Sequence, residues 1–224
     1  MKLILMLALL PVAAVFYYVY RKDRDPEPPR TLGFAFLWGC VSVIPAIIAE
    51  LVFESENLAI ETFLCVGLVE ESVKLAVLML YIWKHADFND SFDAIVYSVT
   101  VSLGFAAIEN IMYVFQGGVM VAVMRALLSI PGHAAFAILM GLFLARAKHH
   151  FYYGRRQQQY LNLFLALCTA TTAHGIYDYL ALSSSDADLS FGWMIGFVVI
   201  LDAVCLLIVH NESKNDRPMV SDKF

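Results

Sequence analysis

Long apolar runs separated by short polar breaks are the feature that most constrains the fold of this chain. Runs of about 20 residues occur at 3–20, 31–53, 60–83, 93–116, 118–147, 160–182 and 190–210. A helix needs about 20 apolar residues to cross a bilayer, and it satisfies its own backbone hydrogen bonds there. The pattern predicts an all-α polytopic bundle of about seven transmembrane spans. The run at 118–147 is long and contains Pro131, so eight elements are an alternative.

Basic residues follow every second apolar run. They are Arg21, Lys22, Arg24 and Arg30 after the first run, Lys84 after the third, Arg146, Lys148, Arg155 and Arg156 after the fifth, and Lys214, Arg217 and Lys223 in the tail. The alternate connections at 54–57, 116–118 and 183–188 contain no Lys or Arg. The positive-inside rule therefore predicts an outside N-terminus and a cytoplasmic C-terminus.

The composition agrees with a membrane protein and excludes several other classes. Of the 224 residues, 60% are hydrophobic and 16% are charged, against about 45–50% and about 25% in soluble domains. The connections leave no room for a sizeable soluble domain, so we expect one integral membrane domain at 1–210 and a cytoplasmic tail at 211–224. There is no basic face for nucleic acid, and the lipid bilayer is the expected surrounding.

Many ionisable residues lie within or beside the predicted spans. They are Glu50, Glu70, Glu71, Lys74, Asp93, Glu109, Arg125, His133, His174, Asp178 and Asp202. Each costs on the order of 2.5–3.5 kcal/mol at bilayer depth unless it faces partners or a wet cavity. Glu70 with Lys74 and His174 with Asp178 are spaced i, i+4, so each pair shares a helix face.

Residues on three separate helices fall at a similar depth. With a rise of 1.5 Å per residue, Glu70 lies roughly 15 Å, Glu109 roughly 10 Å and His174 roughly 13 Å below the outer ends of their runs. This level is the outer half of the bilayer. His133 joins it if the segment before Pro131 lies shallow on the outer side.

Such a cluster offers the groups that hydrolysis of a peptide bond requires. A carboxylate takes a proton from water, and donors hold the oxyanion. Glu70 or Glu71 is the candidate base. His174 is expected to donate to the oxyanion or to bind a metal, with Asp178 fixing its tautomer and orientation.

A metal-free and a metal-bound site both fit these residues. The metal-ligand candidates are His133, His174, Glu70 and Glu109, and two acids with two imidazoles suit Zn²⁺. The same groups can also act without a metal.

Each of these residues also has a structural interpretation. Glu71 and Lys74 form a structural ion pair in that view, and His174 with Asp178 makes a helix contact. Glu109 and the adjacent Asn110 act as interhelical polar contacts. Arg125 pairs with a carboxylate or extends toward the membrane surface. Asp93 is expected at a helix N-terminus, and Glu50 and Asp202 have no assigned role.

Four short motifs resemble the PrsW family. They are EESVK at 70–74, FAAIE at 105–109, RALLSIPGH at 125–133 and HGIYD at 174–178. They are similar to the EExxK, FxxxE and HxxxD pattern of that family, which is distantly related to the CAAX-prenyl proteases and bacteriocin-processing enzymes. The resemblance extends over roughly residues 1–210, and its specificity comes from the four motifs occurring in order.

The resemblance implies a glutamate-dependent intramembrane protease of the bacterial plasma membrane, with Zn²⁺ as an open question. The resemblance also implies that the protein makes the first, site-1 cut in a single-pass anti-sigma factor, which would release a sigma factor under envelope stress. Carried over, Glu70, Glu71, Glu109, His133, His174 and Asp178 are the expected catalytic residues, and Lys74, Arg125 and Asn110 support them.

Two other functions use the same residues differently. A proton- or cation-coupled transporter would use the buried carboxylates as carriers, although such proteins commonly show inverted repeats and this chain shows none. A non-catalytic scaffold would use them only as contacts between helices.

Overall fold

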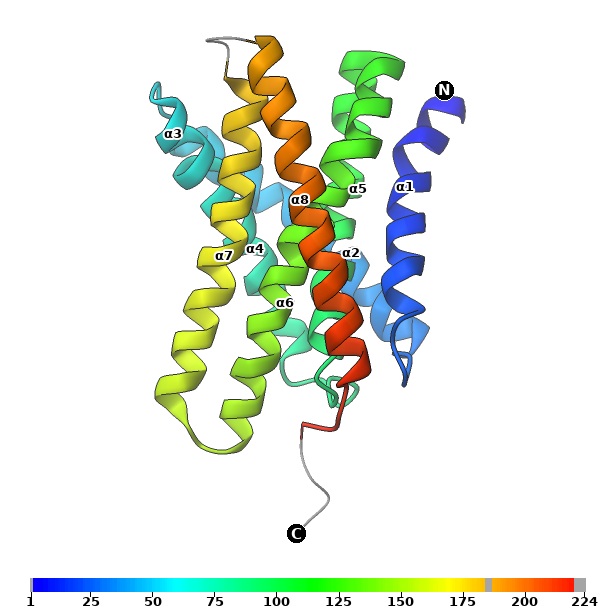
Figure 1. Cartoon of the computed structure of the whole chain (residues 1–224), viewed down its shortest axis with the longest axis vertical. Helices are drawn as coiled ribbons and strands as arrows, with labels where there is room; N and C mark the ends of the chain where they lie inside the picture. Colours follow the sequence, from blue (N-terminus) through cyan, green and yellow to red (C-terminus); the bar gives the residue numbers. More distant parts are fainter. Residues whose placement is uncertain (1, 184–186, 220–224) are drawn as a thin grey trace.

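The structure is a computed structural model that describes residues 2–183 and 187–219, and within these ranges its regular elements are helices. They are α1 (Lys2–Tyr20), α2 (Pro29–Val52), α3 (Leu58–Ile60), the π-helix η1 (Glu61–Gly67), α4 (Leu68–Val77), the π-helix η2 (Leu78–Ile82), α5 (Asp93–Met124), the π-helix η3 (Arg125–Ser129), α6 (Ile130–Tyr152), α7 (Arg156–Leu182) and α8 (Ala187–Lys214). The long helices run side by side in one bundle, with the start of α1 and the end of α8 at opposite ends (Figure 1). We call these the N-terminal end and the C-terminal end of the bundle.

The helices coincide with the apolar runs, which confirms the predicted all-α bundle. Three helical stretches are long and apolar enough to cross a membrane, namely Pro29–Val52, Asp93–Tyr152 and Ser190–Lys214. A shorter apolar helix covers Ala8–Tyr20. A count of seven or eight crossings stays a prediction, because the remaining helices are recognised as spans only from the alternation along the chain.

α5 forms the centre of the bundle. Every residue from Asp93 to Ala107 is buried, and the helix packs against α1, α2, α4 and α6. A helix that is apolar around its whole circumference is expected in the middle of a bundle. Large hydrophobic side chains on the outer helices face outward instead, including Leu51 and Leu80, each 75% exposed. The apolar exterior fits a lipid environment.

Gly118 changes the direction of the chain between the two middle runs. Its φ of 72° and ψ of −157° interrupt α5, and glycine adopts this region without steric cost. The chain then descends through η3 into α6, with Pro131 in the first turn of α6. The long run at 118–147 therefore begins at a sharp turn, and Pro131 stands where its missing N–H is tolerated.

The C-terminal segment packs against the connection that precedes α5. Ser91 donates its N–H to the carbonyl oxygen of Arg217 at 3.1 Å, and Met219 donates to Asn89 at 2.8 Å. α8 extends to Lys214, so the helix includes the first residues of the expected tail. The end of that tail, 220–224, and part of the 183–188 connection, 184–186, lie outside the described residues.

Candidate active site

α4 carries two carboxylates and a lysine on one face. The Nζ of Lys74 donates to Glu70 Oε2 at 3.0 Å and to Glu71 Oε1 at 2.8 Å. All three side chains are buried, and Glu71 has no exposed surface. The ammonium also lies 4.3 Å from the centroid of the Phe105 ring. The i, i+3 and i, i+4 spacings thus allow one cation to compensate two neighbouring acids.

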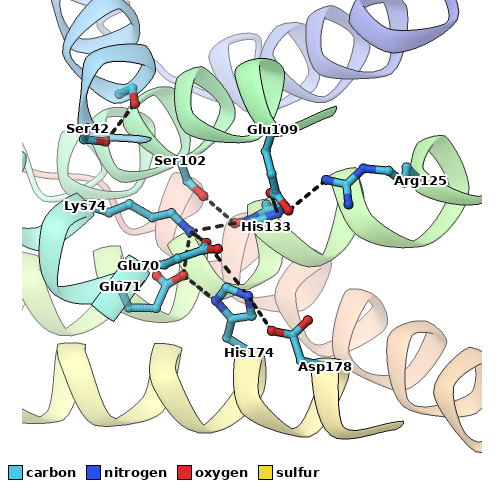
Figure 2. Close-up of polar contacts among 11 residues, drawn as sticks. Ser42, Glu70, Glu71, Lys74, Ser102, Glu109, Arg125, His133, His174 and Asp178 are labelled. Atoms are coloured by element: carbon cyan, nitrogen blue, oxygen red, sulfur yellow. Dashed lines mark hydrogen bonds and ion pairs between the residues drawn. The ribbon is translucent and has the colours of Figure 1, made fainter. Parts of the chain in front are cut away.

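α7 contributes a histidine with a carboxylate at each ring nitrogen (Figure 2). Nδ1 of His174 lies 3.0 Å from Glu71 Oε1. Its Nε2 lies 3.2 Å from Asp178 Oδ2 and 3.9 Å from Glu70 Oε2. The Phe136 ring stacks on the imidazole with 4.8 Å between centroids. The orientation of this imidazole is therefore fixed on both edges and on one face.

A second histidine approaches from α6. Nε2 of His133 lies 2.8 Å from Glu109 Oε2, and Arg125 Nη2 lies 3.2 Å from Glu109 Oε1. Nδ1 of His133 is 3.4 Å from the Nζ of Lys74, and the imidazoles of His133 and His174 have centroids 5.5 Å apart. The predicted residues on α4, α5, α6 and α7 therefore form one polar cluster.

The support for this cluster extends to α1 through Asn110. Arg125 donates its Nε–H to Asn110 Oδ1 at 2.8 Å, and Asn110 donates to the carbonyl oxygen of Ala8 at 2.7 Å. Asn110 has no exposed surface. Ser102 donates its hydroxyl to the carbonyl oxygen of His133 at 2.9 Å. These bonds fix the arginine and the start of α6, and thereby the two groups that contact Glu109.

Two π-helical segments lead into helices that carry the site. η1 precedes α4, and η3 precedes α6. A π-turn shifts the register of the residues that follow it, and such turns often occur at functional sites. A Cβ on Gly175 would lie 2.5 Å from the Phe63 ring of η1. Glycine beside His174 therefore allows η1 to pack closely against α7.

The cluster lies beside a cavity of about 310 Å³. Its ionisable lining residues are Glu50, Glu70, Glu109, Arg125, His133, His174 and Asp178. Glu71 and Lys74 contact several of these groups but do not line the cavity. Glu70 is thus the α4 carboxylate that a molecule in the cavity can reach, whereas Glu71 is enclosed behind it.

Counting along the helices places the site at a common depth. At 1.5 Å per residue, Glu70 lies about 18 Å from the start of α3, Glu109 about 14 Å from Gly118, and His174 about 12 Å from the end of α7. In Figure 1, α3, the turn inside α5 and the end of α7 lie at the N-terminal end of the bundle. Similar depths on separate helices explain how residues far apart in the sequence meet.

The donor atoms are suited to a metal ion. Glu70, Glu109 and His133 each offer one ligand atom, with all three atoms within 4.8 Å of one another, and Glu70, Glu71 and His174 form a second such group. The first group lines the cavity, while the second includes the enclosed Glu71. Carboxylate oxygen and imidazole nitrogen are ligands that Zn²⁺ accepts. The first group is thus the better fit.

The structure also locates three further ionisable residues of the predicted spans. Asp93 is the first residue of α5, as expected. Glu50 at the end of α2 lines the cavity, which the sequence did not indicate. Asp202 lies on α8 beside a separate, mainly apolar cavity that includes Cys205. No sequence spacing links Glu50 to the other groups, so only the packing of α2 on α5 could reveal its position.

A cavity lined by carboxylates and imidazoles inside an apolar helical bundle offers the groups of a membrane-embedded hydrolase. The family described as "PrsW family intramembrane metalloprotease" matches residues 27–207. Proteins named Protease PrsW are similar over most of the chain. The one from Oceanobacillus iheyensis is 33% identical, covering 95% of this chain and 97% of its own length. The one from Bacillus subtilis is 35% identical, with 85% and 87% covered.

The chain therefore belongs to the PrsW family and is a membrane-embedded peptidase. No solved structure matches it. Membership in a peptidase family favours hydrolysis over the transport and scaffold functions that the sequence left open.

Proposed function

We propose that this protein is an endopeptidase of the bacterial plasma membrane that makes the site-1 cut in a single-pass anti-sigma factor. The observation that carries the proposal is the shared cavity, because Glu70, His133 and His174 come from three helices and all face it. This arrangement provides a proton acceptor and donors on different sides of a bound peptide bond. Cleavage of the anti-sigma factor would release a sigma factor under envelope stress.

In the proposed mechanism, Glu70 accepts the proton of the attacking water. It is the carboxylate on α4 that lines the cavity. Glu71 is a positioning residue that holds Nδ1 of His174 at 3.0 Å. Asp178 holds Nε2 of the same ring at 3.2 Å before the substrate binds. In the reaction, His174 donates the Nε2–H to the carbonyl oxygen of the scissile bond in place of Asp178.

We further propose a metal-bound form of the site, in which Glu70, Glu109 and His133 hold Zn²⁺ and Glu70 is a ligand instead of the base. When bound, the ion would acidify water and polarise the scissile carbonyl. Arg125 and Asn110 keep Glu109 in place for this role, through the contacts at 3.2 Å and 2.8 Å.

We propose that the N-terminal end of the bundle faces outward. The Lys and Arg residues concentrate in the connections at the opposite end, after α1, η2 and α6 and in the C-terminal segment. The positive-inside rule assigns that end to the cytoplasm. A site 12–18 Å below the outward end, by helix rise, suits a cut near the outer boundary of a substrate helix.

The test compares the terminal peptides of single-pass membrane proteins in cells that express either the wild type or Glu70→Gln. Glu71→Gln and His174→Ala are tested in parallel. The matched control is Glu56→Gln, because Glu56 is an exposed glutamate at the same end of the bundle. A new cut near an outer membrane boundary, present with the wild type and the control but absent from the site variants, supports the proposal.

Other results would contradict parts of it. If the cut persists in Glu70→Gln, Glu70 is not the base, and loss of the cut in Glu71→Gln then leaves Glu71 as the remaining candidate. If every variant inserts and cleaves normally, the cavity is not the active site. If cleavage is lost but the substrate is not an anti-sigma factor, the peptidase chemistry stands and the substrate assignment is wrong.

A further inference from the structure

Three carboxylates converge at the C-terminal end of the bundle, away from the candidate active site. Asp23 and Glu27 lie in the connection between α1 and α2, and Asp93 begins α5. Each offers one oxygen, and the three oxygens lie within 4.8 Å of one another. Asp93 precedes Glu109 by 16 residues, which corresponds to about 24 Å along a helix. The two clusters are therefore separate.

These side chains are buried to an unusual degree for acids outside an active site. Asp23 is 8% exposed, Glu27 4% and Asp93 1%. Buried acids are normally paired with a cation or fully hydrogen-bonded. Among the described residues, no Lys, Arg or His lies within 4.0 Å of any of the three carboxylates.

Two of the carboxylates keep one buried oxygen without a partner. Asp93 Oδ2 accepts the N–H groups of Asn89 and Asp90 at 2.9 and 2.7 Å, while Oδ1 has no hydrogen-bond partner. Asp23 Oδ1 accepts the N–H of Asp25 at 3.1 Å, while Oδ2 has none. In both residues the backbone fixes one oxygen and leaves the other free for a ligand.

The remaining contacts keep the third carboxylate in position without neutralising it. Tyr97 donates its hydroxyl to Glu27 Oε2. Lys148 lies in the same region but donates to the carbonyl oxygen of Trp83 and faces the Phe88 ring, 4.1 Å from its centroid. The three carboxylates are therefore buried together, and none of the side chains that the structure describes forms an ion pair with them.

We propose that Asp23, Glu27 and Asp93 bind a hard divalent cation, Ca²⁺ or Mg²⁺. Both ions prefer oxygen ligands and complete their coordination with water. Unpartnered carboxylate oxygens on a rigid backbone supply such ligands, and the ion removes the cost of burying like charges together. A bound ion would tie the α1–α2 connection to the start of α5 and thus stabilise the C-terminal end of the bundle.

The test measures the thermal unfolding midpoint and heat of binding of the purified, chelator-treated protein in detergent. Ca²⁺ and Mg²⁺ are titrated separately. The titration is done at about pH 8, because carboxylate ligands must be deprotonated to bind an ion and protons compete less at higher pH. At 100-fold above its Kd, the ion should raise the midpoint by about 5 °C or more.

Variants locate the binding site. Asp23→Asn/Glu27→Gln should remove the shift, whereas Asp25→Asn, a change of an exposed neighbouring acid, should retain it. If the double variant does not fold, Asp23→Asn alone should weaken binding at least about tenfold. Glu109→Gln changes the candidate metal site formed by Glu70, Glu109 and His133. It should leave the ion-induced rise of the unfolding midpoint unchanged.

Three results would overturn the proposal. The first is a wild type whose midpoint and heat show no response to either ion, which leaves protons as the partners of these acids. The second is an unchanged response in Asp23→Asn/Glu27→Gln. The third is a response that disappears in Glu109→Gln, because the ion would then bind at the candidate active site.

Discussion

Replacement of Lys74 by methionine should be among the most destabilising single changes in the site. Methionine keeps much of the apolar volume but leaves Glu70 and Glu71 buried without the cation that lies 3.0 and 2.8 Å away. Two unit charges about 4 Å apart interact by about 4 kcal/mol at an effective dielectric of 20. Breaking a buried pair by removing one partner costs about 3–5 kcal/mol. We therefore expect a loss of about 3–5 kcal/mol in the free energy of unfolding.

A second substitution tests whether charge is the cause. Glu71→Gln removes one of the two carboxylates, so Lys74→Met/Glu71→Gln should lose less than the sum of the single variants, with a coupling of about 2 kcal/mol. The assay is reversible unfolding in mixed micelles, followed by tryptophan fluorescence. Lys84→Met is the control, because Lys84 is exposed just beyond the end of η2.

Either of two results would show that the charge of Lys74 is not what stabilises the site. One is a Lys74→Met variant that loses less than about 1 kcal/mol, since a buried pair cannot then depend on this cation. The other is strict additivity in the double variant, which would show that the lysine stabilises the bundle by packing and not by its charge.

Three further predictions concern the backbone and the metal. In a peptide cleavage assay, Gly175→Ala should lower the cleavage rate by up to about 100-fold, because the added Cβ would lie 2.5 Å from the Phe63 ring and displace His174. Adding Phe63→Leu should restore part of the rate. If the double variant is no more active than Gly175→Ala, the close approach to Phe63 is not the cause. Gly118→Ala should lower the free energy of unfolding by about 1–3 kcal/mol, because residue 118 has a φ of 72° that alanine rarely adopts. The cost is due to the backbone alone, since a Cβ there meets nothing within 4 Å. An unchanged unfolding midpoint would contradict this prediction. Chelation of the purified enzyme should abolish cleavage and Zn²⁺ should restore it, while full activity in a protein shown to be metal-free would exclude the proposed metal site.

The sequence predicted those parts of the site that depend on regular helical spacing. Glu70 with Lys74, and His174 with Asp178, lie one turn apart, and their contacts at 3.0 and 3.2 Å agree with that spacing. The common depth of Glu70, Glu109 and His174 also followed from counting residues between polar connections. Local periodicity and span length were sufficient for these features.

The parts that could not be predicted depend on interruptions of helical periodicity. The approach of His133 to Glu109 requires the turn at Gly118 and the π-helix η3, and both change the register in a way that a 3.6-residue period does not report. Asn110 meets Ala8 across 102 positions of sequence. Glu50 lines the cavity because of the way α2 packs in the bundle. The spacing of residues along α2 does not indicate this packing.

The pairing of Lys74 within its own helix has a consequence for how the chain enters the membrane. Both of its carboxylate partners lie within one turn, so α4 can carry its charged groups into the bilayer already compensated. Glu109, by contrast, meets Arg125 and His133 only after 16 and 24 further residues have been synthesised. During biosynthesis Glu109 of α5 must therefore stay in contact with water or the insertion machinery until its partners have been synthesised. The cavity is complete only when α7, which carries His174, has been inserted.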